Sequence, residues 1–140
     1  MKVVPLLLER MRAALDAHDL DAFVEFFQED YVGERPLHPD AAPSTRDDVR
    51  NNWSEVIRDV PDLRIEIPAA TQDGDTIWSE WRAYGRARSG AQLELRGAII
   101  FGVRGNRVAW SRMYLEPVES ASAAPLPRFA APVPAPQFEL

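Results

Sequence analysis

The spacing of apolar residues along this chain changes at Pro61. Before Pro61, apolar side chains recur every three or four residues, which is typical of amphipathic helices. After it, Leu63, Ile65 and Ile67 alternate with charged residues, which is typical of strands with one buried face. Helices followed by alternating strands predict an α+β fold, with the helices packed on one sheet. A chain of 140 residues, 46% of them apolar, has room for one such domain.

Three helices are expected before Pro61. The first spans residues 5–17, with a proline in its first turn, where the missing N–H costs nothing. The second begins after Asp19, a residue type that caps helices, and carries Phe27 inward. Residues 31–45 hold three prolines and a glycine and are expected to form a loop before the third helix, which Pro61 ends.

Strands are expected throughout the rest of the domain. Turn sequences separate them at Asp73-Gly74, Ser89-Gly90 and Gly105-Asn106. The last strand is expected to run from Val108 to Val118. Short turns between consecutive strands predict an antiparallel meander.

The end of the sequence has a different composition. Six of the chain's 12 prolines lie between Pro117 and Leu140, which excludes regular helix or strand there and favours extended backbone. The chain therefore divides into a domain of residues 1–118 and a Pro/Ala-rich tail of residues 119–140. Four apolar tail residues are expected to pack on this domain or on a partner subunit: Leu126, Phe129, Val133 and Phe138.

Composition excludes several classes of protein. A net charge of −6 argues against nucleic acid as a partner, because phosphates need a basic surface. No cysteine and two distant histidines leave no metal-ligand spacing, and no glycine-rich phosphate loop is present, so we expect no metal and no cofactor. Pro5 and Glu9 interrupt the apolar run at the start, which predicts no signal or membrane segment and a cytoplasmic protein.

Three segments carry a family resemblance: AALDAHDLDAFVEFFQED, the step Val60-Pro61-Asp62-Leu63, and GNRVAWSRMYLEPV. Together they resemble SnoaL-like proteins and ketosteroid isomerases of the nuclear transport factor 2-like superfamily, over roughly residues 6–118. The resemblance implies a cone-shaped α+β domain. In it, three N-terminal helices pack on a curved antiparallel sheet of four or more strands and enclose a pocket.

The family's catalytic residues are mostly absent from the matching positions. Ketosteroid isomerases use a first-helix tyrosine, which is matched here by Met11, and an aspartic acid that falls at Ile99 or Ala98. Their loop base aligns near Glu34 and Arg35.

Limonene-epoxide hydrolases, which share this fold, use one arginine and two aspartates. The matching positions hold Trp81, Ala83 and Met113. These side chains transfer no proton, so the resemblance predicts neither steroid isomerisation nor epoxide hydrolysis by the known sets of residues.

Two groups of site residues are expected from the matched positions. The catalytic candidates are Glu34, His38 and Tyr31: Glu34 stands near the loop base of the family, and an imidazole can carry protons near neutral pH. Each could instead be an ordinary solvated or core residue. The expected substrate-binding residues are Met11, Phe27, Arg35, Trp53, Trp81, Ile99 and Met113. Such an apolar pocket suits a flat hydrophobic ligand, although the same side chains could simply fill the core.

The register of the final strand has two readings. If Met113 faces the pocket, then Arg112, Tyr114 and Glu116 lie on the outer face of the sheet with Trp78. That face is rich in aromatic residues and arginine and would suit a homodimer interface. A slip of one residue would exchange the faces and place the same three residues at the pocket mouth.

We therefore expect a cofactor-independent enzyme of the cyclase or isomerase type. Its partner would be a hydrophobic small molecule, a polyketide-like or terpenoid-like biosynthetic intermediate. The alternative is a non-catalytic protein that binds such ligands and has lost the acid–base residues. A third reading is an interaction subunit that works through its tail and its sheet face.

Overall fold

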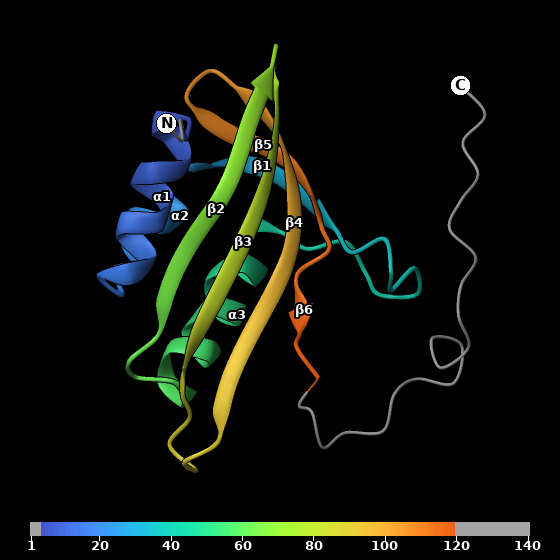
Figure 1. Ribbon diagram of the computed structural model, residues 1–140. Coiled ribbons are helices and arrows are strands. Elements are labelled where there is room, and N and C mark those ends of the chain that lie inside the picture. The colour runs from blue at the N-terminus through green and yellow to red at the C-terminus, as the bar shows by residue number, and fades with distance from the viewer. Residues whose placement is uncertain (1–3, 120–140) are drawn as a thin grey trace, which may run out of the picture.

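The computed structural model describes residues 4–119, which form three helices and six strands (Figure 1). Their order along the chain is α1 (Leu6–Asp16), α2 (Leu20–Val24), β1 (Phe27–Glu34), α3 (Arg46–Asp59), β2 (Arg64–Asp73), β3 (Thr76–Arg86), β4 (Gln92–Arg104), β5 (Arg107–Met113) and β6 (Glu116–Pro117). This is the expected α+β class.

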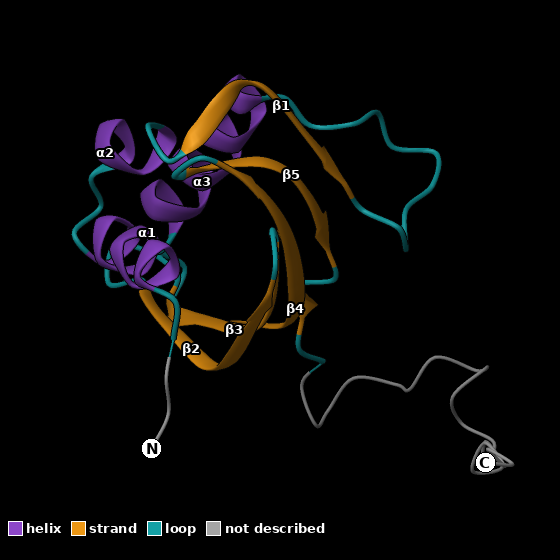
Figure 2. Ribbon diagram, turned by 90° about the horizontal axis from the view of Figure 1, so that it is seen from above, coloured by secondary structure: helices purple, strands orange, loops and turns teal. Residues whose placement is uncertain are grey.

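All six strands belong to one curved sheet. The order across it is β1-β5-β4-β3-β2, and the short β6 pairs with β4. Neighbouring strands are antiparallel except β1 and β5, which are parallel. Seen from above, the sheet curls round, and α1, α2 and α3 lie along its open side (Figure 2). The apolar core fills the space between helices and sheet.

Local sequence sets the helix boundaries. The side chain of Asp19 accepts a hydrogen bond from the backbone N–H of Ala22 at 3.1 Å and so caps α2. Thr45 and Asp48 form a reciprocal capping box at the start of α3. Helix α3 ends before Pro61, as its sequence predicts.

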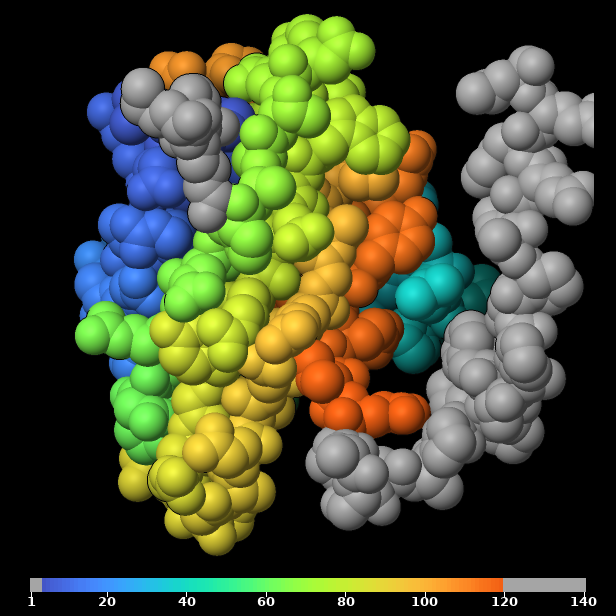
Figure 3. All heavy atoms as spheres, viewed as in Figure 1, coloured from blue at the N-terminus to red at the C-terminus, as the bar shows by residue number. Residues whose placement is uncertain are grey.

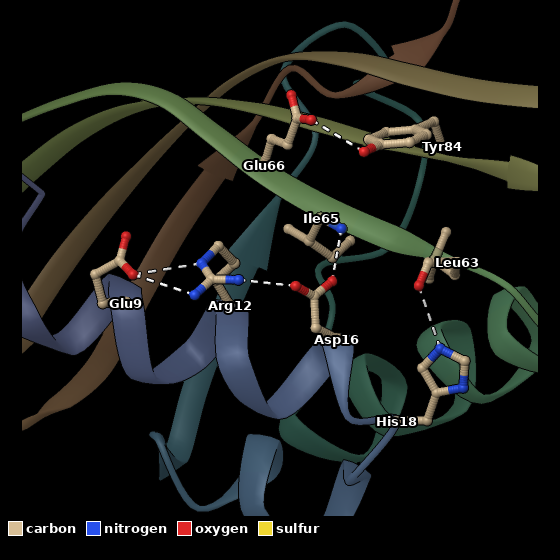
Figure 4. Close-up of polar contacts among 8 residues, drawn as sticks. All are labelled: Glu9, Arg12, Asp16, His18, Leu63, Ile65, Glu66 and Tyr84. Atoms are coloured by element: carbon tan, nitrogen blue, oxygen red, sulfur yellow. Dashed lines mark hydrogen bonds and ion pairs between the residues drawn. The ribbon is translucent and has the colours of Figure 1, made fainter. Parts of the chain in front are cut away.

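Asp16 fastens α1 to the sheet. Its carboxylate accepts the backbone N–H of Ile65 on β2 at 2.8 Å and pairs with Arg12 at 2.8 Å (Figure 4). In the following turn, Nε2 of His18 lies 3.3 Å from the carbonyl oxygen of Leu63. The end of α1 is thereby held against the start of β2 by polar contacts as well as by packing.

The structure corrects the expectation for residues 27–34. Phe27 was assigned to a helix and Tyr31 to a loop, whereas both lie in strand β1. Along this strand Phe27, Tyr31 and Gly33 are buried, whereas the other residues are more exposed. The helices are therefore not consecutive, because β1 separates α2 from α3.

The sheet is also mixed rather than antiparallel throughout. β1 pairs in parallel with β5, joining two segments that lie far apart in the sequence. The final strand stops at Met113 instead of reaching Val118. The backbone of Tyr114 passes so close to Gly97 that a Cβ there would collide with the Tyr114 carbonyl. The chain stays alongside β4 here, and β6 pairs with β4 in the same register as the end of β5.

The structure decides the register of the final strand. Met113 pairs with the buried Ile99 and lines the interior, whereas Tyr114 lies in a groove on the outer face with Trp78. Arg112 is also on the outer side, with its guanidinium carbon 5.0 Å from the ring centroid of Trp110. Figure 3 looks onto this outer face, where the green, yellow and orange atoms of the strands form one continuous surface.

The Pro/Ala-rich tail expected at residues 119–140 lies outside the described residues, apart from Glu119. Packing of its four apolar residues stays a prediction.

Candidate functional site

Two cavities lie between the sheet and the helices. The outer cavity, of about 270 Å³, lies where β1, β4 and β5 face α3, and it has a mostly apolar lining. Its lining residues are Tyr31, Gly33, Glu34, Arg35, Ser44, Val49, Asn52, Trp53, Val56, Leu95, Ser111, Met113 and Leu115. The inner cavity, of about 30 Å³, is lined by Met11, Phe23, Phe27, Tyr31, Val49, Trp53, Trp81, Ile99, Phe101, Ser111 and Met113.

Large side chains fill most of the space around the inner cavity. Phe27 packs edge-on against Phe23 and Tyr31, with ring centroids 5.2 and 4.9 Å apart. The Trp81 indole lies 6.0 Å from the Phe101 ring, and its N–H donates to the Ser79 hydroxyl at 2.8 Å. The remaining volume is close to that of one water molecule. Of these two cavities, only the outer one has room for a ligand larger than a water molecule in this conformation.

The boundary between the cavities carries a pair of hydroxyl groups. Tyr31 Oη on β1 lies 2.6 Å from Ser111 Oγ on β5, and both residues are buried. Gly33 makes this approach possible, since a Cβ at that position would collide with the tyrosine hydroxyl. The parallel pairing of β1 with β5 places Gly33 directly beside Ser111.

Burial keeps the Tyr31 hydroxyl protonated. Desolvation raises the pKa of Tyr31 above its ordinary value of 10.0, and the hydrogen bond with Ser111 acts in the opposite direction. Two O–H groups in contact need only one proton between them. The other proton remains available to an acceptor on a bound ligand.

Glu34 lies at the edge of the outer cavity and is exposed. It is the one carboxylate residue among the described residues that line this cavity. Glu34 pairs in register with Arg112 on β5, and Arg112 lies on the outer side of the sheet. Tyr31, by contrast, is buried. Glu34 thus stands at the rim, apart from the hydroxyl pair.

Glu116 on β6 contacts two other candidate residues, Arg35 and His38. One of its carboxylate oxygens lies 2.6 Å from Nε2 of His38 and 3.3 Å from a guanidinium nitrogen of Arg35. His38 is exposed and is not among the residues that line either interior cavity. The pairing fastens the loop between β1 and α3 to β6.

The expected substrate-binding residues divide between the cavities. Trp53 and Met113 line both, Arg35 lines the outer cavity, and the others line only the inner one: Met11, Phe27, Trp81 and Ile99. Of the two alternatives for the family's aspartic acid position, Ile99 is buried and Ala98 is exposed.

The sequence pattern indicates the position of two polar residues that line the outer cavity. Ser111 alternates with Met113 on the final strand and therefore shares its face. Asn52 follows Val49 by three residues and precedes Val56 by four, which places it on the same side of α3. Ser111 was expected in the pocket lining as a minor polar residue, whereas Asn52 was not among the expected site residues.

No set of three or more potential metal-binding side chains comes together within residues 4–119. In the same part of the chain, no helix is long and apolar enough to cross a membrane.

Comparisons with known proteins agree with this architecture. The sequence profile of the SnoaL-like domain matches residues 8–110. Among curated proteins, none matches the sequence.

Several solved structures share the fold. AclR, a candidate hydroxylase from Streptomyces galilaeus, superposes with a TM-score of 0.69 at 14% identity, over 78% of this chain and 75% of its own. IdmH, a candidate polyketide cyclase from Streptomyces antibioticus, gives 0.68 at 18% identity, over 79% and 89%. A protein of ketosteroid isomerase-like fold from Catenulispora acidiphila, solved with trimethylamine, gives 0.67 at 17% identity, over 86% and 89%.

At these identities the structural similarity shows the fold alone. The sequence match covers most of the chain; it includes Tyr31 on β1 and ends one residue before Ser111 on β5. This chain belongs to the SnoaL-like domain family.

Proposed function

We propose that this protein is a cofactor-independent enzyme of the cyclase or isomerase type that binds a small hydrophobic carbonyl compound in the outer cavity. The observation that carries the proposal is the buried pair of Tyr31 and Ser111 hydroxyls in a mostly apolar lining. Apolar pockets with a few convergent polar groups are the usual form of small-molecule sites.

The hydroxyl pair suits the stabilisation of an enolate oxygen. Ser111 donates its proton to Tyr31 Oη, and Tyr31 donates its own to the carbonyl oxygen of the ligand. Chains of hydrogen bonds in a low-dielectric site polarise one another, and a donor fixed in advance costs little reorganisation as charge develops. Enolisation next to a carbonyl is the step that cyclisation by carbon–carbon bond formation and double-bond isomerisation have in common.

A proton acceptor is needed on the other side of the reacting carbon. Glu34 is our candidate for that role, because it supplies a carboxylate at the rim of the outer cavity. Arg35 and His38 hold the loop between β1 and α3 in place through their shared contact with Glu116. In this proposal Glu34 alone accepts the proton, so replacement of His38 leaves the proton-transfer step in place.

The second candidate is a non-catalytic binding protein for the same class of ligand. It is favoured by the exposure of Glu34 and by its register with Arg112 on the outer side of the sheet. A site with the hydroxyl pair but without a carboxylate in reach would hold a carbonyl compound and leave it unchanged.

Deuterium exchange separates the two candidates without knowledge of the natural substrate. Acetophenone has one ring, one carbonyl and exchangeable methyl protons, and their loss in D₂O is followed by NMR. An enzyme accelerates this exchange, and Tyr31→Phe reduces the acceleration at least tenfold, while Tyr84→Phe on the outer face leaves it unchanged. Binding of acetophenone with exchange no faster than in buffer would support the binding protein and reject the enzyme.

The protein also presents a surface for self-association. We propose a homodimer through the outer sheet face, where Trp78 is 51% exposed and lines a groove with Ile100 and Tyr114. Aromatic residues of this kind are enriched in protein interfaces. The cytoplasmic location and the role of the tail stay predictions.

A further inference from the structure

The outer and inner cavities are separated by a single layer of side chains. Five residues line both of them: Tyr31, Val49, Trp53, Ser111 and Met113. A ligand too large for the outer cavity can gain further space inside the fold only through this layer. The freedom of each of the five therefore decides how the site responds to ligand size.

Four of the five are held in place. Tyr31 and Ser111 hold each other by a hydrogen bond of 2.6 Å, and Tyr31 also packs against Phe27. Trp53 packs edge-on towards Phe23, with ring centroids 6.2 Å apart. Val49 is branched at Cβ and sits in a helix, where its side chain has one strongly preferred rotamer.

Met113 has more freedom than the other four. Its side chain is unbranched, has three rotatable bonds and adapts to irregular gaps. It is only half-buried, whereas the other four are buried. It is also the last residue of β5, just before Tyr114, whose backbone passes close to Gly97.

We propose that Met113 is a movable partition that sets the size of ligand the site accepts. In the position seen here it limits the site to the outer cavity of about 270 Å³. A cavity of roughly 150 Å³ already accepts benzene, so the outer cavity suits a one-ring ligand. A two-ring ligand displaces the Met113 side chain and reaches the inner cavity beside Trp81. This inference rests on the proposed function only in that the outer cavity binds an aromatic carbonyl compound.

Two ligands that differ by one ring test the partition. Acetophenone and 2-acetylnaphthalene carry the same carbonyl group, and their dissociation constants are measured by NMR titration of the full chain. Met113→Ala is expected to tighten 2-acetylnaphthalene at least tenfold relative to acetophenone. Met113→Leu, of similar volume but branched, is expected to weaken the two-ring ligand and leave the one-ring ligand unchanged.

Leu95→Ala is the matched control, because Leu95 lines only the outer cavity and is also half-buried. It enlarges the site without touching the partition. If Leu95→Ala changes the ratio of the two dissociation constants as much as Met113→Ala does, the partition is not at Met113 and the proposal is overturned.

Trp81 gives an independent readout, since it lines the inner cavity but not the outer one. Its indole N–H signal, assigned with a Trp81→Phe variant, is expected to shift on binding 2-acetylnaphthalene and to stay in place with acetophenone. Binding of both ligands with an unmoved Trp81 signal overturns the partition but leaves the proposed function standing. If neither ligand binds the wild type or any variant, both the partition and the proposed function are overturned.

Discussion

The hydroxyl of Tyr31 lies 2.6 Å from that of Ser111, although the two residues are 80 positions apart in the sequence. The contact exists because β1 and β5 run parallel, with Gly33 beside Ser111. Hydroxyl groups buried in an apolar wall are costly to leave without a partner. This pair therefore contributes both to the stability of the fold and to the chemistry proposed for the cavity.

Removing one hydroxyl should destabilise the fold. Tyr31→Phe leaves Ser111 buried without its partner, so we expect the free energy of unfolding to fall by about 1–3 kcal/mol. Urea denaturation measures the change. Tyr84→Phe removes a hydroxyl whose partner, Glu66, is exposed, and should cost much less. Additive effects of Tyr31→Phe and Ser111→Ala in the double variant would show that the two hydroxyls do not interact.

The raised pKa of Tyr31 predicts that the fold loses stability at high pH. Burial raises the pKa of Tyr31, so just above its ordinary value of 10.0 the unfolded chain has lost a proton that the folded chain retains. The free energy of unfolding must then fall as pH rises through this range. The difference between wild type and Tyr31→Phe should be constant below pH 10 and should shrink above it. A difference that grows with pH would mean that the pKa is lowered instead.

Gly33 should tolerate no side chain while Tyr31 keeps its hydroxyl. Gly33→Ala places a methyl group where the tyrosine hydroxyl lies, and overpacking of this kind costs about 1–3 kcal/mol. Because the hydroxyl is the nearest atom, the double variant with Tyr31→Phe should recover part of that loss. Thermal unfolding by circular dichroism measures all three proteins. Equal costs of Gly33→Ala in both backgrounds would place the clash elsewhere.

Glu116→Gln should loosen the loop between β1 and α3. The carboxylate of Glu116 holds both Arg35 and His38, so its neutralisation weakens two contacts at once. We expect faster hydrogen exchange at the amides of residues 36–43, with less than about 1 kcal/mol change in global stability because the contacts are exposed. Glu119→Gln, a neighbouring exposed acid, is the control. Unchanged exchange in Glu116→Gln would show that the loop is held by other contacts.

The proposed dimer predicts a specific sensitivity of the outer face. Trp78→Glu places a charge in the centre of an apolar contact and should convert the dimer to a monomer in analytical ultracentrifugation. Leu6→Glu changes an apolar residue that is even more exposed but lies on α1, and it should leave the dimer intact. A wild-type monomer at all concentrations would reject the dimer.

The strand pattern after Pro61 could be predicted because alternation is a local signal. Leu63, Ile65 and Ile67 are all buried. For the final strand the same rule left two registers open, and only the structure places Met113 inside. Strand β1 was missed because Phe23 and Phe27 are four residues apart, a spacing that fits a helix equally well.

The site itself depends on features that no local pattern carries. The contact of Tyr31 with Ser111 requires the parallel register of β1 and β5, which joins distant segments. The sizes of the two cavities depend on how side chains from distant segments pack together. The resemblance to ketosteroid isomerases led to the inner residues, such as Met11 and Ile99, where little space remains.

Asp16 has a consequence for how such a domain can change its ligand during evolution. By bonding to the backbone of Ile65 it anchors the end of α1 to β2, with little dependence on which side chains β2 presents. The rim near Glu116 relies instead on exposed side-chain pairs, which mutation can exchange at small energetic expense. New specificities would therefore arise first around the rim, while the anchored end preserves the framework.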